Sequence, residues 1–157
     1  MQSIDHYQDW LVRFVRESNR IEGIYREDVF SDVAALDEFL RPPQINVGHL
    51  GYYVSVIQPD AVLRDRVGLD VEINGYLAPL GCPEIRDGLV SILNDMGSPF
   101  RAHVRYEQLH PFTDGNGRSG RALWLWQMLH TQESERAKQL GFLHTFYYQT
   151  LSAGHPS

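Results

Sequence analysis

The sequence contains one cysteine, Cys82, among 157 residues. A single cysteine excludes an intramolecular disulfide and any metal cluster built from several cysteines, and it fits a reducing compartment. No segment reaches the run of about 18 apolar residues that a membrane span requires, and no basic stretch precedes an apolar run at the amino terminus. We therefore expect a soluble, cytoplasmic protein that has no membrane partner.

Basic residues are also in short supply. Lys and Arg number 14 against 20 Asp and Glu, which gives a formal net charge of -6. A general nucleic-acid binder needs a basic surface, so the sequence predicts no nucleic-acid partner. The balance is uneven, because residues 22–40 hold six acids and one arginine, whereas residues 101–121 hold four arginines and two acids. One basic, glycine-rich segment in an acidic protein indicates a local site for a small anion.

Repeats, low-complexity tracts and Ser/Gly-rich linkers are absent too, so we expect residues 1–157 to form a single domain. Apolar residues recur every three or four positions along most of the chain, which is the period of amphipathic helices. This period predicts helices within 4–15, 29–40, 45–57, 83–93, 97–109, 118–129 and 133–151. The predicted fold class is all-α.

One segment breaks the helical pattern. From Leu69 to Tyr76, apolar and acidic residues alternate and run into an Asn74-Gly75 pair, which is the signal of a short β-hairpin with a tight turn. A lone hairpin contributes little to a core, so we expect this hairpin to have a functional role. Its edge is suited to hold an extended segment of a partner protein by strand addition.

The chemistry is concentrated in residues 110–121, which read HPFTDGNGRSGR. The glycine spacing matches the dinucleotide fingerprint, but no hydrophobic strand precedes it and no βαβ unit surrounds it, so we reject a Rossmann fold. The glycines instead allow the amides of Gly115, Asn116 and Gly117 to turn inward at the start of a helix that begins near Arg118. Free amides and the helix dipole make a site suited to phosphate.

The side chains of this segment suit a phosphoryl transfer. His110, whose ordinary pKa is about 6.5, can be neutral and remove a proton from an attacking hydroxyl. Asp114 is the hard oxygen ligand that Mg²⁺ takes together with waters and substrate phosphates. Asn116 can donate to a phosphoryl oxygen, and Arg118 and Arg121 lie three residues apart on one helix face, where they suit bidentate phosphate contacts. Only a nucleophile is missing, so we expect the substrate to supply it.

This segment resembles the signature of the Fic family, HxFx(D/E)GNGRxxR, at every specified position. The resemblance implies that the chain is one small Fic domain, an all-α helical bundle with one short β-hairpin flap. It also implies that the protein transfers AMP from ATP to a Ser, Thr or Tyr hydroxyl of a target protein. ATP would be the substrate and Mg²⁺ the cofactor. The expected partners are therefore ATP and a protein with an exposed hydroxyl side chain, and a homo-oligomer is left open.

Carried over residue by residue, the resemblance assigns a role to each part of the site. His110 would be the general base, Asp114 the Mg²⁺ ligand, and Phe112 an inward anchor without chemistry. The phosphates would be held by Gly115, Asn116, Gly117, Arg118 and Arg121, with Asn116 on the α-phosphate and the arginines on the outer ones. The flap, at about residues 64–80, would position the target through Val71, Ile73, Asn74 and Gly75.

A second resemblance lies near the amino terminus. Residues 18–23 read SNRIEG and fit the Fic inhibitory motif, (S/T)xxxE(G/N), at the end of the first expected helix. The resemblance implies an inhibitory helix over residues 1–23 with Ser18 and Glu22 as its functional residues. Glu22 would pair with Arg121, removing the cation that the γ-phosphate needs. At about 4 Å such a pair gains roughly 4 kcal/mol of Coulomb energy at an effective dielectric of about 20, less the desolvation cost.

Three other functions stay open on the sequence. The same site can run in reverse and remove AMP from a modified target, with Glu22 orienting a water. A Doc-like kinase resembles a pattern with Lys where this chain has Gly117, and this difference argues against it. A non-enzymatic, nucleotide-sensing or antitoxin-type module is expected to carry a decayed motif, whereas this motif is intact.

Overall fold

The computed structural model of the protein describes residues 4–73 and 76–131, which contain six helices and two short strands. The helices are α1 (Ile4–Ile21), α2 (Phe30–Leu40), α3 (Val47–Ile57), α4 (Glu84–Asn94), α5 (Pro99–Leu109) and α6 (Asn116–Leu129), and the strands are β1 (Glu72–Ile73) and β2 (Tyr76–Leu77). The predicted all-α class is confirmed. The helix predicted within 133–151 lies outside the described residues.

Local signals explain where the helices begin and end. α3 starts with a reciprocal cap, in which Asn46 Oδ1 accepts from the His49 amide and His49 Nδ1 accepts from the Asn46 amide. α5 starts at Ser98, whose hydroxyl accepts from the Arg101 amide, and a proline follows at the first helical position. α6 begins at Asn116, earlier than the sequence predicted.

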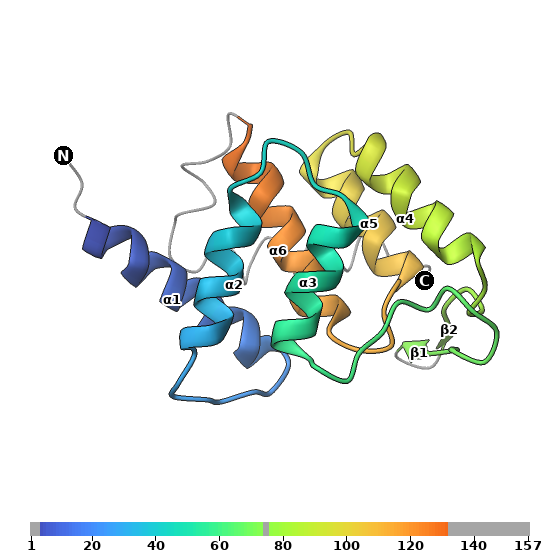
Figure 1. The fold of residues 1–157 in the computed structure, drawn as a ribbon, viewed down its shortest axis with the longest axis horizontal. Helices are drawn as coiled ribbons and strands as arrows, with labels where there is room; N and C mark the ends of the chain where they lie inside the picture. Colours follow the sequence, from blue (N-terminus) through green and yellow to red (C-terminus); the bar gives the residue numbers. More distant parts are fainter. Residues whose placement is uncertain (1–3, 74–75, 132–157) are drawn as a thin grey trace.

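α6 runs through the middle of the bundle and packs against α1, α2, α3 and α5 (Figure 1). All of its residues are buried except Gly117 and Leu129. A helix covered on every side must be apolar or have its polar groups paired inside the protein. The polar side chains that α6 carries in its first two turns therefore need partners from the surrounding helices.

The hairpin is shorter than predicted. β1 and β2 pair antiparallel with Glu72 opposite Leu77, and the Ala78 amide extends the pairing by donating to Val71 O at 3.2 Å. The strand does not reach back to Leu69, whose carbonyl oxygen accepts from Arg64 Nη1 at 3.1 Å. The turn at residues 74–75 lies outside the described residues, and the use of the hairpin as a flap stays a prediction.

No helix within residues 4–73 and 76–131 combines the length and the apolar character needed to cross a membrane. The single-domain organisation over residues 1–157 stays a prediction, because the last part of the chain is not described.

Candidate active site

His110 lies just after α5 in a left-handed conformation, with φ of 51°. Its Nδ1 is 3.3 Å from Glu107 O. A carbonyl only accepts, so Nδ1 carries the proton in this contact and Nε2 keeps its lone pair. Burial lowers the pKa of His110, and the charge of Arg64 lowers it further, against the opposing effects of the Glu107 carbonyl and of Glu22 and Asp114. A neutral imidazole with a free Nε2 suits the predicted general base.

Asn116 closes the loop between His110 and α6. Its Oδ1 accepts from the Phe112 amide at 2.9 Å, and its Nδ2 donates to Phe112 O at 2.7 Å. Phe112 is buried in the core, as the predicted inward anchor should be. Asn116 thus has a structural task that the sequence did not indicate. Its predicted contact with the α-phosphate stays a prediction and would have to use the second hydrogen of Nδ2.

The start of α6 presents a row of backbone amides. Gly115 precedes the helix with φ of 77°, and the first helical hydrogen bond runs from the Ser119 amide to Gly115 O. The amides of residues 116–118 therefore have no acceptor within the helix. The Gly115 amide donates to Asp114 Oδ1 at 2.7 Å. The predicted amide row at 115–117 is thus moved along by one residue, because the helix starts earlier than expected.

Asp114 is exposed beside this row. Within the described residues, the carboxylate accepts a hydrogen bond only through Oδ1. The other carboxylate oxygen, a hard ligand, therefore faces solvent. Residues 4–73 and 76–131 contain no group of three His, Cys, Asp or Glu side chains that could hold a metal. A Mg²⁺ ion at Asp114 would complete its shell with substrate phosphates and waters, as this ion commonly does. Asp114 therefore fits a metal that arrives with a nucleotide.

Arg121 is fully buried in α6 and faces α1. Its Nε donates to Ser18 Oγ at 2.7 Å, and its Nη2 donates to Ser18 O at 2.9 Å. The same Nη2 lies 2.8 Å from Glu22 Oε1, in an ion pair whose arginine side chain is 0% exposed and whose glutamate side chain is 39% exposed. The pair predicted between Glu22 and Arg121 is therefore present.

The end of α1 presents Glu22 through a tight turn. The amides of Glu22 and Ile24 both donate to Asn19 O, at 3.0 and 2.9 Å. Gly23 takes the left-handed conformation, with φ of 72°, which glycine adopts without strain. The glycine that follows the glutamate in the motif thus has a backbone reason to be there.

The Glu22 carboxylate lies over the first turn of α6. A Cβ atom at position 117 would overlap Glu22 Oε1 and would come within 3.2 Å of Arg121 Nη1. Glu22 thus occupies the place where an anion bound at the start of the helix would sit. Gly117 has a steric role, because the lysine expected of a Doc-like kinase would displace Glu22.

Arg118 does not join Arg121 on one anion-binding face. Its Nη1 donates to Ile57 O at 3.0 Å and its Nη2 donates to Gln58 Oε1 at 2.8 Å, at the end of α3. The expectation of two arginines acting together is therefore corrected. The reason is that α6 is buried between α1 and α3. Arg121 donates to residues at the end of α1, whereas Arg118 donates to residues at the end of α3. A phosphate contact of Arg118 stays a prediction that requires these bonds to be exchanged.

Arg64 also belongs to the site, although no pattern in the sequence predicted it. This side chain is 0% exposed, and its Nε donates to His110 O at 2.7 Å. Nothing local distinguishes it from Arg66, which is exposed two residues later. The acceptors of Arg64 come from segments far along the chain, so no spacing rule identifies it.

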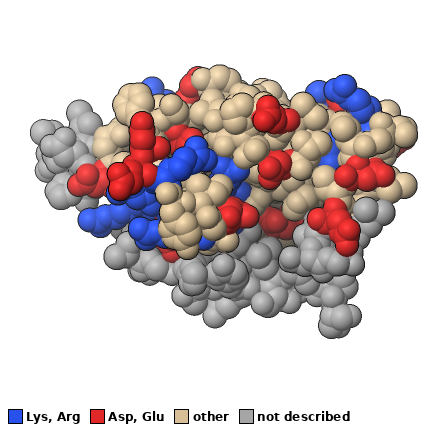
Figure 2. All heavy atoms as spheres, turned by 90° about the horizontal axis from the view of Figure 1, so that it is seen from below, with Lys and Arg blue, Asp and Glu red and all other residues tan. Residues whose placement is uncertain are grey.

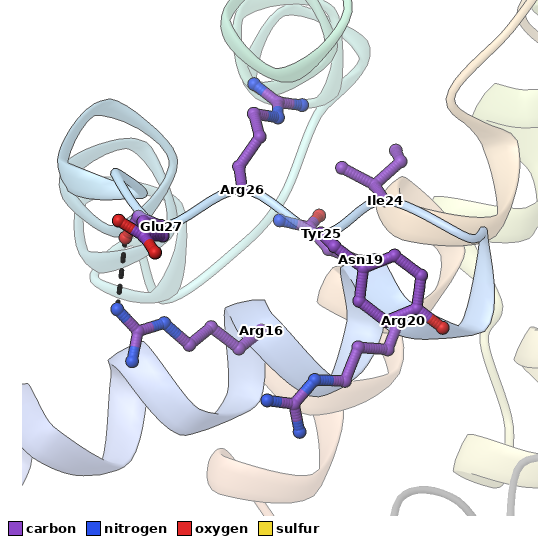
Figure 3. A pocket seen from close by; sticks show the side chains of 7 residues that line it. All are labelled: Arg16, Asn19, Arg20, Ile24, Tyr25, Arg26 and Glu27. Carbon is purple, nitrogen blue, oxygen red and sulfur yellow. Dashed lines mark hydrogen bonds between the residues drawn. The ribbon is translucent and has the colours of Figure 1, made fainter.

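A pocket of about 530 Å³ lies beside the end of α1 (Figure 3). It is lined by Arg16, Asn19, Arg20, Ile24, Tyr25, Arg26 and Glu27, none of which is a predicted site residue. Arg16 Nη2 donates to Glu27 O at 3.0 Å across one side of it. On the molecular face shown in Figure 2, Arg side chains lie among Asp and Glu side chains. The lining residues therefore flank Ser18 and Glu22 along the chain without including either of them.

Residues 83–128 match the family described as Fic/DOC. The matched range contains His110, the loop after it and α6 up to Met128, but not Ser18 or Glu22. No curated protein matches the chain.

Proposed function

We propose that the chain is a protein adenylyltransferase that holds itself inactive, and the match of residues 83–128 to the Fic/DOC family supports this proposal. It would transfer AMP from ATP to a Ser, Thr or Tyr hydroxyl of a target protein. The observation that carries the inhibited state is the 2.8 Å ion pair between Arg121 and Glu22, two residues 99 positions apart in the sequence.

The transfer uses His110 as the base. Nε2 takes the proton of the target hydroxyl while the hydroxyl oxygen bonds to the α-phosphorus of ATP. The bond from that phosphorus to the bridging oxygen breaks, and pyrophosphate is released. The free amides of residues 116–118 hold the phosphate oxygens. Mg²⁺ bound at Asp114 would neutralise charge on the phosphates. The lowered pKa of His110 favours this role, because it keeps the imidazole unprotonated at neutral pH.

Glu22 blocks the outer phosphate in two ways. Its carboxylate takes one donor of Arg121 and lies at the start of α6, so a γ-phosphate would meet like charge and no free cation. ATP therefore binds productively only in the fraction of molecules in which Glu22 has moved away. Glu22 follows the last residue of α1 and is partly exposed, so its movement does not require α1 to unfold.

The target would bind along the hairpin. An extended peptide beside β1 or β2 would present its hydroxyl to His110, with Val71, Ile73, Asn74 and Gly75 positioning it. The support for this step is the antiparallel pairing of the two strands at the position where the family resemblance places the flap.

One observation favours a second function. Glu22 lies near enough to His110 for its charge to raise the pKa of the imidazole against the effect of burial. In the reverse reaction, Glu22 would orient a water whose oxygen bonds to the phosphorus of the modified target. The bond from that phosphorus to the target oxygen would break, AMP would be released, and the target oxygen would receive the proton that the water gives up.

The test incubates the wild-type protein, Glu22→Gly and the double variant His110→Ala/Glu22→Gly with labelled ATP and a cell lysate, followed by mass spectrometry. We expect Glu22→Gly to label itself or lysate proteins, and the double variant to bind ATP without labelling. His49→Ala in the Glu22→Gly background is the matched control, because His49 caps α3 away from the site.

Undiminished labelling by the His110→Ala double variant would overturn the assignment of the base. If the wild-type protein releases AMP from the labelled proteins and Glu22→Gly cannot, the reverse reaction is the function.

A further inference from the structure

Arg64 binds more of the backbone than its contact with His110. Its guanidinium donates to four carbonyl oxygens, those of Leu69 (3.1 Å), Pro79 (2.7 Å), Leu109 (2.8 Å) and His110 (2.7 Å). Leu69 and Pro79 lie before β1 and after β2, whereas the other two lie at the end of α5. A single buried side chain thus joins the base of the hairpin to the residue that carries the proposed base.

The main chain around Arg64 makes a second connection to the same loop. The Arg64 amide donates to Pro111 O at 2.9 Å, and an isolated antiparallel bridge joins Leu63 to Phe112. The segment that carries Arg64 therefore runs alongside the residues that directly follow His110. Backbone and side chain hold this loop from the same side.

We infer that Arg64 is a positioning residue for AMP transfer, which sets His110 in place and keeps the base in register with the hairpin that receives the target. The inference rests on the proposed function. Arg64 touches neither the nucleotide nor the attacking hydroxyl in this scheme, and it acts through the backbone of His110.

The conformation of His110 explains why a positioning residue is needed. It is the only non-glycine residue with positive φ in the described parts of the chain. L side chains rarely adopt this conformation, so the surrounding contacts must hold it. Carbonyls at the end of a helix also lack partners within the helix, and a cation there is favourable. Arg64 is a cation at the end of α5, and it donates one hydrogen bond to His110 O and one to Leu109 O.

The charge of Arg64 gives the inference a measurable signature. Burial is the largest cause of the lowered pKa of His110, and of the three charged groups that act on the imidazole, Arg64, Glu22 and Asp114, Arg64 is the one that lowers the pKa further. Replacement of Arg64 by a neutral side chain should therefore raise the pKa of the imidazole. Arg64→Lys keeps the charge and should leave the pKa of the imidazole unchanged, so the two variants separate the charge of Arg64 from its packing.

The experiment compares Arg64→Met and Arg64→Lys, each in the Glu22→Gly background, using labelled ATP and self-modification as the readout. Arg64→Met should lower the rate at saturating ATP by tenfold or more, leave the KM for ATP within twofold, and move the acid limb of the pH profile to higher pH. Arg64→Lys keeps the charge and loses the fork, so it should lower the rate without moving the acid limb. Arg66→Met is the control, because Arg66 is exposed and contacts only Asp65 as an ion pair.

Two results would overturn the inference. One is a pair of Arg64 variants that behave like Arg66→Met, and the other is a loss of rate matched by an equal loss of ATP binding with no shift of the pH profile. If Arg64→Met does not fold, Arg64→Lys becomes the test variant. A rate of self-modification by Arg64→Lys equal to that of the Glu22→Gly parent would overturn the inference.

An NMR titration of the His110 imidazole in the wild-type protein and in Arg64→Met needs no activity. It separates failure of this inference from failure of the proposed function, which would show as an inactive Glu22→Gly parent. An unchanged imidazole pKa in a folded Arg64→Met protein would overturn the inference in either case.

Discussion

Two buried arginines, Arg64 and Arg121, bind residues of the candidate site, and their acceptors differ. Arg64 donates to four backbone carbonyls beneath the loop that carries His110. Arg121 donates to Ser18 and to the carboxylate of Glu22, whose side chain is 39% exposed. Both guanidinium groups are withdrawn from water, but only Arg121 has a partner that can return to water.

This difference separates a fixed contact from an exchangeable one. Backbone carbonyls cannot leave Arg64 unless the chain around them is displaced. A partly exposed carboxylate loses little by turning toward solvent, because water and salt replace most of what the ion pair provides. The side of the site around Arg64 thus keeps one geometry, whereas the side around Arg121 can exchange a carboxylate for a phosphate.

The strongest test of the comparison removes Arg121. In the Glu22→Gly background, Arg121→Ala should lower self-modification about 100-fold, because loss of a buried cation that binds a phosphate costs about 2 to 5 kcal/mol. The loss should appear as a raised KM for ATP. Arg20→Ala, in the same background, is the control for an exposed arginine at the end of α1. Equal rates for the two variants would mean that Arg121 does not bind the nucleotide.

Acid should weaken the fold on the Arg121 side. Burial, followed by the charge of Arg121, lowers the pKa of His103 to about 3. The unfolded chain binds a proton at about pH 6.5, so stability is kept above this pH and is lost as the pH falls from 6.5 toward 3. We expect a loss of about 2 kcal/mol in the free energy of unfolding at pH 5, measured by urea denaturation. His103→Gln should remove most of this dependence, and an unchanged slope would exclude His103 as its source.

Removal of the Glu22 carboxylate should open the exchangeable side. Glu22→Gly should raise self-modification at low ATP about tenfold, which corresponds to about 1.4 kcal/mol for an ion pair whose carboxylate is 39% exposed. Glu22→Gln keeps the shape and should give a smaller increase. Glu27→Gly is the control, because Glu27 lies in the same loop and its carboxylate makes no recorded ion pair with a described residue. An unchanged rate would mean that the SNRIEG match carries no inhibition.

The smallest effect is expected at Ser18. Ser18→Ala removes the acceptor of Arg121 Nε but leaves the contacts of Nη2 with Ser18 O and Glu22. One hydrogen bond of this kind is worth about 0.5 to 1.5 kcal/mol, so activity should rise about threefold. Ser55→Ala on α3 is the control, since Ser55 Oγ bonds only locally to Tyr52 O. A rise equal to that of Glu22→Gly would show that Ser18 is as important as the charge.

The helices could be predicted because their signals are local. The three-to-four-residue apolar period and the caps at Asn46 and Ser98 lie within one or two turns of the residues they affect. The start of α6 was predicted too late because its signal is not a cap of the usual kind. Gly115 begins the helix by its backbone conformation, and Asn116 closes the loop behind it.

The sequence by itself determined the helical class, which follows from the apolar spacing, and its resemblance to a family motif predicted the pairing of Glu22 with Arg121 that the structure contains. Only the tertiary structure decided that Arg118 binds the end of α3, that Arg64 holds His110, and that Glu22 covers the start of α6. The physical reason is that these contacts join segments far apart in the chain. A buried polar group takes whichever partner the packing brings within reach, and the packing of α1 and α3 on α6 is not contained in any local period.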